Sequence, residues 1–73
     1  MTRAQRIQRA ADSIGAERIS RCRWEYTDDA TRRAYVATTG ELLRLARYLD
    51  DPRYAGDAYS HWCAATTPRE VTR

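Results

Sequence analysis

The apolar residues of the chain follow two different periods, which predict helices in some segments and strands in others. Between Ala4 and Ile14, alanine and isoleucine recur every three or four residues, so they share one face of a helix. Thr2 and Gln5 form the capping-box pattern that starts many helices. Gly15 directly follows the last apolar position and predicts the end of this helix.

The period changes to two over residues 18–26, which predicts a β-strand. One face of this strand carries Ser20, Cys22, Trp24 and Tyr26. Residues 27–32 are typical of a turn, and residues 33–38 form a second short apolar stretch. Together the two stretches predict a β-hairpin.

The hairpin prediction leaves two points open. Its turn contains no glycine, so the register of the two strands is undetermined. A helix over residues 29–39 is an alternative, because three alanines in it have helical spacing and Gly40 follows. That alternative would make the chain an all-α bundle.

The clearest predicted helix begins at Thr38, which forms a capping box with Glu41. Its apolar face consists of Leu42, Leu45, Ala46 and Leu49. A third helix begins at Pro52 or, because Gly56 weakens its first turn, near Asp57. Its apolar positions are Tyr54, Ala58, Trp62 and Ala65.

These elements predict a small α+β domain in which one helix is followed by a β-hairpin and two further helices. A chain of 73 residues has room for a single domain. We place this domain at residues 1–66 and expect residues 67–73 to form a flexible polar tail.

Large aliphatic side chains are scarce in the composition. Leu, Ile and Val number nine together and Phe is absent, whereas there are five Tyr and two Trp. The net charge of +3 is small and the aromatic rings bury large areas, so we expect a folded chain. So few aliphatic groups predict a marginal monomer, which completes its packing on a partner.

The composition also favours protein binding as the function. All 13 basic residues are arginine, and the cores of protein interfaces are enriched in Tyr, Trp and Arg. We therefore predict a small non-enzymatic modulator or inhibitor that occludes a surface of an unidentified protein. Its candidate contacts are Arg21, Arg23, Trp24, Tyr26, Tyr35, Tyr54, Tyr59 and Trp62.

A basic nucleic-acid-binding module is the alternative. Eight of the 13 arginines lie in the first 33 residues, where five acidic residues leave a local charge of +3. Guanidinium groups interleaved with aromatic rings suit phosphates and bases. The candidate contacts are Arg3, Arg6, Arg9, Arg21 and Arg23. A homodimeric structural subunit is the second alternative.

The sequence predicts no catalytic, metal or cofactor site, and therefore no enzyme. Cys22, His61 and Cys63 are possible zinc ligands, but they lack a paired C-x-x-C motif. Cys63 beside His61 lacks the orienting group that a nucleophile needs. No stretch approaches the roughly 20 apolar residues of a membrane helix. With no visible signal peptide, we expect a cytoplasmic chain with free thiols and no membrane partner.

In size and composition the chain resembles the small accessory proteins of bacteria and their phages, anti-CRISPR proteins among them. It shares with them a short sequence without motifs that carries many arginines and tyrosines. The resemblance implies a protein that inhibits or redirects a host machine by occupying one of its surfaces. It covers size and composition and no motif.

Overall fold

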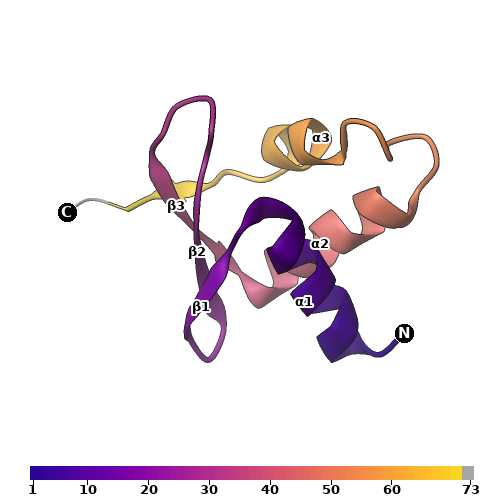
Figure 1. Cartoon of the computed structure of the whole chain (residues 1–73), viewed down its shortest axis with the longest axis horizontal. Coiled ribbons are helices and arrows are strands. Elements are labelled where there is room, and N and C mark those ends of the chain that lie inside the picture. The colour runs from indigo at the N-terminus through magenta and orange to yellow at the C-terminus, as the bar shows by residue number, and fades with distance from the viewer. Residues whose placement is uncertain (72–73) are drawn as a thin grey trace.

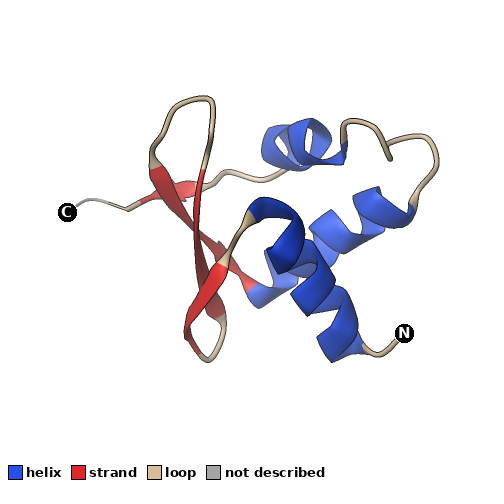
Figure 2. Cartoon of the chain, in the orientation of Figure 1, coloured by secondary structure: helices blue, strands red, loops and turns tan. Residues whose placement is uncertain are grey.

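Three helices lie on one side of a four-stranded antiparallel sheet in the computed structural model, which describes residues 1–71 (Figures 1 and 2). The elements are α1 (Arg3–Ile14), β1 (Glu17–Ser20), β2 (Arg23–Thr27), β3 (Ala34–Thr38), α2 (Thr39–Asp50), α3 (Ala58–Ala65) and β4 (Arg69–Glu70). The sheet order is β1-β2-β3-β4, so each strand pairs with the next strand along the chain, although α2 and α3 lie between β3 and β4. The predicted α+β class is confirmed.

The predicted ends of the first two helices are present. Thr2 and Gln5 form a reciprocal capping box at the start of α1, and Thr38 and Glu41 form the same box at the start of α2. Gly15 ends α1 in the left-handed conformation with φ +67°. Each of these features depends on a few neighbouring residues, which is why the sequence predicts them well.

The single strand predicted over residues 18–26 is wrong, because the chain turns back within it. β1 ends at Ser20, and Arg21 and Cys22 form a tight turn into β2. The guanidinium group of Arg18 donates hydrogen bonds to the carbonyl oxygens of Ser20 and Arg21, at 3.1 and 3.0 Å. A side chain therefore stabilises a turn that lacks glycine and proline, and Cys22 is exposed in it.

The pairing of β2 with β3 settles the hairpin register. Trp24 lies opposite Ala37, and Tyr26 lies opposite Tyr35, so these four side chains share the face toward the helices. Pairing an indole with a methyl group leaves room for the large ring. The alternative helix over residues 29–39 is wrong, because residues 29–31 form a turn and residues 34–38 form β3.

The third helix follows the later of the two predicted starts. Residues 52–57 form turns, and Asp57 takes the cap position of α3. Before this helix, the carboxylate of Asp51 accepts a hydrogen bond from the backbone N–H of Arg53 at 3.0 Å and stabilises the first of these turns. Tyr54 therefore lies in the connection between α2 and α3 and not on a helix.

The C-terminal strand β4 was not predicted. Arg69 and Glu70 pair with β3, and the N–H of Val71 donates to the carbonyl of Ala34 at 2.8 Å. The sheet therefore continues past residue 66, where we placed the end of the domain. Thr72 and Arg73 of the predicted tail lie outside the described residues, and its flexibility stays a prediction.

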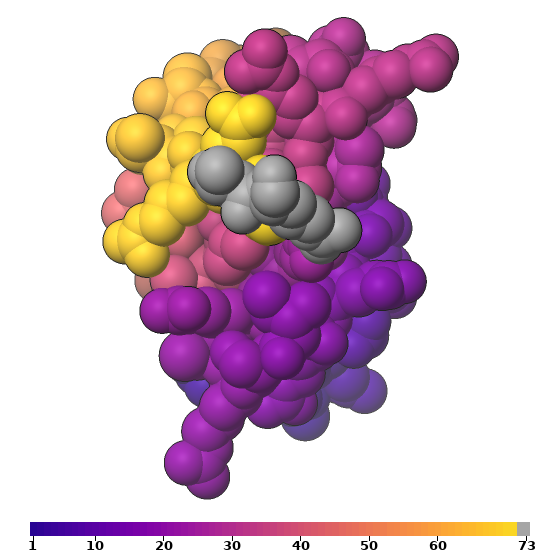
Figure 3. Space-filling view, turned by 90° about the vertical axis from the view of Figure 1, so that its left-hand side faces the viewer, coloured from indigo at the N-terminus to yellow at the C-terminus, as the bar shows by residue number. Residues whose placement is uncertain are grey.

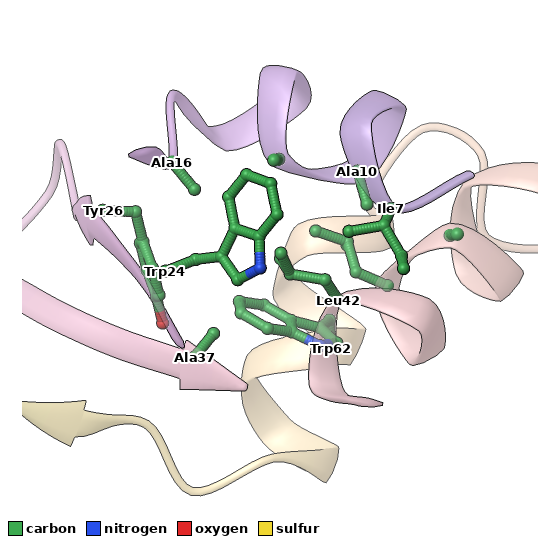
Figure 4. Packing of buried hydrophobic residues seen from close by; sticks show 11 residues of the cluster. Ile7, Ala10, Ala16, Trp24, Tyr26, Ala37, Leu42 and Trp62 are labelled. Carbon is green, nitrogen blue, oxygen red and sulfur yellow. The ribbon is translucent and has the colours of Figure 1, made fainter. Parts of the chain in front are cut away.

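Aromatic rings fill the space between the sheet and the helices (Figure 4). Trp62 of α3 is fully buried, and its indole N–H donates to the carbonyl oxygen of Glu41 at 2.7 Å. The rings of Trp62 and Tyr26 lie 5.6 Å apart. Ile7 and several alanines complete the core from α1, where small side chains allow close approach of the helix.

We expect Trp62→Phe to lower the free energy of unfolding by about 1–3 kcal/mol, because the partly buried carbonyl of Glu41 loses the indole donor and the smaller ring fills less of the core. Urea unfolding followed by far-ultraviolet circular dichroism measures this change. Ile19→Ala is the control, since Ile19 is 52% exposed and its loss should cost at most about 0.5 kcal/mol. A Trp62→Phe variant as stable as the wild type would contradict this account of the core.

Candidate functional site

Three of the predicted protein contacts lie in the core. Trp24, Tyr26 and Trp62 are 7%, 2% and 0% exposed. The hydroxyl of Tyr26 has no hydrogen-bond partner among the described residues, and burial raises its pKa. In a chain without Phe, these rings supply the buried area that a core needs. These three rings are therefore core residues of the folded chain, which corrects their interpretation as surface contacts.

The other predicted contacts lie in separate places. Tyr35 and Tyr59 are half-buried beside the ring of Tyr26, at 5.8 and 6.5 Å between ring centres. Arg21 and Arg23 are exposed, at the β1–β2 turn and at the start of β2. The structure thus brings together no single aromatic contact surface from the residues that the sequence singled out.

An aromatic cluster that the sequence did not reveal surrounds Tyr54. The centre of its ring lies 4.6 Å from that of His61 and 5.1 Å from that of Tyr48. The guanidinium carbon of Arg53 lies 5.4 Å from the ring centre of Tyr54. Hydrogen bonds from Arg53 lower the pKa of Asp51, which anchors this arginine. We call Tyr48, Arg53, Tyr54 and His61 the tyrosine cluster.

The predicted nucleic-acid contacts lie in three different settings. Arg3, Arg6 and Arg21 face the region around the N-terminal half of α1. Arg9 instead forms an ion pair with Asp50 of α2. Arg23 alternates with the inward-facing Trp24, so it points to the sheet face opposite the helices. Figure 3 views the molecule from that side.

Two shallow clefts flank the N-terminal half of α1. The first, of about 260 Å³, lies between α1 and α2 and contains Arg3, Arg6 and Arg47. The second, of about 250 Å³, lies between α1 and the sheet and contains Arg3, Arg18 and Arg21. We call the five residues Arg3, Arg6, Arg18, Arg21 and Arg47 the arginine face.

The positive charge of this face is poorly compensated. Asp50 is the one carboxylate among the described residues that line either cleft, and it already pairs with Arg9. Within residues 1–71, the guanidinium groups of Arg3, Arg6, Arg21 and Arg47 form no ion pair or hydrogen bond. These four groups are available to an anionic partner.

The first turn of α1 differs from that of α2 in one charge. The capping boxes of the two helices have the same distances. In each box the backbone N–H of the threonine donates to the side-chain oxygen of the third helical residue at 2.8 Å, and the backbone N–H of that third residue donates to the threonine hydroxyl at 3.2 Å. The third residue is Glu41 in α2 but the neutral Gln5 in α1, whose first turn contains no acidic residue. Arg3 and Arg6 oppose the helix dipole there, which costs about 0.3–1 kcal/mol each at an exposed position. Helix stability therefore does not explain this arrangement.

Acidic side chains gather at the opposite end of α1. Glu17, Glu25 and Asp29 line another cleft, together with Ile14 and Gly15 at the end of the helix. The molecule thus has a positive surface around the start of α1 and a negative one around its end. An anionic partner is attracted to the first and repelled by the second.

The residues considered for metal binding or nucleophilic catalysis lie in unrelated settings. His61 contacts the carboxylate of Asp57 at 3.1 Å. Burial raises the pKa of the Cys63 thiol, against the effect of a hydrogen bond with Tyr59. Among the described residues, no three His, Cys, Asp or Glu side chains are grouped as metal ligands, and no helix is long and apolar enough to cross a membrane. The absence of enzymatic activity stays a prediction.

Arg18 and Arg47 are the members of the arginine face that the sequence did not single out as nucleic-acid contacts. Arg47 reaches this face because α2 packs against α1, a long-range contact that no local pattern contains. Arg18 reaches it because β1 turns back at residues 21–22. Comparisons with protein-family models, with curated proteins and with solved structures find no match to the chain.

Proposed function

We propose that the chain is a non-enzymatic module that binds nucleic acid through the arginine face. One observation carries the proposal: five arginines from α1, α2 and the β1–β2 region gather around two clefts, in which the single carboxylate contributed by residues 1–71 is already paired. Phosphate groups are the anions for which the donor fork of a guanidinium group is best suited.

The shape of the face favours an extended anion over a small one. Each cleft is open and smaller than the roughly 300–1,000 Å³ of typical small-molecule pockets. The arginines are instead distributed over three elements on both flanks of α1. A nucleic-acid backbone presents phosphates over such a distance, and each contact releases counterions that drive association.

The face also lacks the apolar centre of a protein interface. The aromatic residue in its clefts, Trp24, is 7% exposed, and Leu43 is half-buried. Large exposed anchors dominate the affinity of protein interfaces. The arginine face therefore supports nucleic acid more strongly than the protein partner that the composition favoured.

We expect the double variant Arg6→Ala, Arg47→Ala to bind nucleic acid more weakly and with a smaller salt dependence. The slope of log K against log salt should fall by about one for each phosphate that the variant no longer binds. Fluorescence anisotropy with a labelled oligonucleotide, titrated at several salt concentrations, measures the slope. The matched control is Arg23→Ala, Arg69→Ala, which removes the same charge from the sheet face opposite the helices. Equal reductions in both variants would mean that net charge, and not the arginine face, governs binding.

We expect Gln5→Glu to change stability and binding in opposite directions. The new carboxylate keeps the capping box and improves the dipole interaction, raising the free energy of unfolding by about 0.3–1 kcal/mol. The same carboxylate lies next to Arg6 and should weaken nucleic-acid binding. Urea unfolding and anisotropy measure the two effects. Glu41→Gln is the control, which lowers stability slightly and leaves binding unchanged. A Gln5→Glu variant that binds like the wild type would count against the arginine face.

The tyrosine cluster supports a second candidate function, the surface-occluding protein binder that the composition predicted. Arg53 over the half-buried Tyr54 combines the two residue types that are enriched among interface hot spots. The cluster spans the end of α2, the α2–α3 connection and α3, outside both clefts of the arginine face. The implied likeness to phage accessory proteins stays an expectation, as does a homodimer.

We expect Tyr54→Ala to abolish capture of a specific protein while the fold is kept, because Tyr54 is outside the central core cluster. Affinity capture from the native cells, compared by mass spectrometry, is the measurement. The Arg23→Ala, Arg69→Ala variant is the matched control and should retain the partner. If the same proteins are captured by Tyr54→Ala and the wild type, the tyrosine cluster is not the contact.

A further inference from the structure

The arrangement of the arginine face on both flanks of α1 indicates which nucleic acid it fits. Arg6 and Arg47 lie on the flank toward α2, and Arg18 and Arg21 lie on the flank toward the sheet. In Figure 1 the start of α1 and the β1–β2 turn both lie at the lower end of the molecule, and Arg3, Arg18 and Arg21 line one cleft there. Building on the proposed function, we infer that the partner is double-stranded DNA and that the N-terminal half of α1 enters its major groove.

The dimensions of the helix match this groove. An α-helix with its side chains is about 10–12 Å across, and the major groove of B-DNA is about 12 Å wide. A helix in the groove has a phosphate backbone on each side. The two arginine flanks therefore meet the two strands, Arg6 and Arg47 on one and Arg18 and Arg21 on the other.

The charge along α1 orients the helix in the groove. Its first half has Arg3 and Arg6 and no acidic residue. In its second half Arg9 is already paired with Asp50, and Asp12 is exposed. Glu17 lies three residues beyond the end of the helix. Phosphates repel the acidic end. The helix therefore enters by its N-terminal half, and the acidic cleft near Gly15 stays outside the duplex.

The two exposed glutamine amides of α1 are not free to read bases. The amide of Gln8 donates to Asp12 at 2.8 Å, and the amide oxygen of Gln5 accepts the N–H of Thr2 at 2.8 Å. These are the side chains that would pair with adenine, and both are engaged within the helix. Because both amides are engaged and the flanking arginines are directed at phosphates, we expect an affinity that depends little on sequence.

Two other nucleic acids fit the face less well. Single strands are bound by stacking bases on exposed aromatic rings, and the indole of Trp24 is buried with its N–H directed to Thr39 at 3.4 Å. Double-stranded RNA has a deep and narrow major groove that does not admit a helix. The arginine face therefore favours B-form DNA over both.

The test compares three labelled probes of the same sequence and length with the full chain: duplex DNA, single-stranded DNA and duplex RNA. Anisotropy titrations at one salt concentration should show several-fold tighter binding to duplex DNA, and a second duplex of unrelated sequence should bind equally. Methyl green, a major-groove ligand, should compete, whereas netropsin, a minor-groove ligand, should not.

Variants on each flank test the two-strand geometry. Arg47→Ala and Arg21→Ala should each reduce the salt slope on duplex DNA by about one, and Arg23→Ala should leave it unchanged. Circular dichroism confirms that each variant is folded. A reduced slope at one flank alone would overturn the inferred placement of α1.

The remaining outcomes separate this inference from the proposed function. Equal affinity for the three probes, tighter binding to either RNA or a single strand, or competition by netropsin would overturn the major-groove assignment and leave nucleic-acid binding standing. Binding to none of the probes at low salt would overturn the proposed function itself.

Discussion

The hydrogen bond from the indole of Trp62 to the carbonyl of Glu41 is the contact on which the C-terminal half of the fold depends. It joins α3 to the first turn of α2 at 2.7 Å, while the ring of Trp62 packs on Tyr26 of the sheet. α3 has eight residues and β4 has two, so neither is stable without tertiary contacts. A fully buried indole whose N–H is hydrogen-bonded supplies them. The radius of gyration, 11.5 Å, is close to the value of about 11 Å typical of a compact domain of this length.

The need to fill that core determines what remains for the surface. With few aliphatic groups, the chain places both indoles and Tyr26 inside. Sequence patterns assign these rings to an apolar face correctly, yet a strand or helix face is apolar in the same way whether it meets the chain's own core or a partner. The distinction depends on packing between distant elements, which explains why the aromatic contacts could not be judged from the sequence. It also leaves the arginine face without an aromatic anchor.

Local signals made most of the elements predictable. The caps at Thr2 and Thr38 and the stop at Gly15 each follow from residues within one turn of helix. The break after Ser20 was hidden, because the side chain of Arg18 stabilises the turn in place of glycine or proline. β4 was hidden for another reason: two polar residues carry no period, and only the unpaired edge of β3 makes them a strand. The arginine face was hidden for both kinds of reason. Arg18 and Arg21 join it through the β1–β2 turn, and Arg47 joins it through the packing of α2 on α1.

Arginine suits such a surface because its position is partly determined by the fold. Arg9 is fixed by Asp50, and Arg18 by two carbonyl oxygens, so two of the basic side chains around α1 help to hold the helix and the turn in place. The remaining guanidinium groups, on Arg3, Arg6, Arg21 and Arg47, project from this frame without an ion pair among residues 1–71. A planar guanidinium group binds phosphate through two parallel N–H···O hydrogen bonds, whereas the ammonium group of lysine acts as a point charge. Because the packing of α1 against α2 and the sheet fixes where these side chains start, it also limits the distances between their guanidinium groups. Guanidinium groups at such distances suit the spacing of phosphates along a nucleic-acid backbone, and this requires neither a pocket nor an exposed aromatic ring.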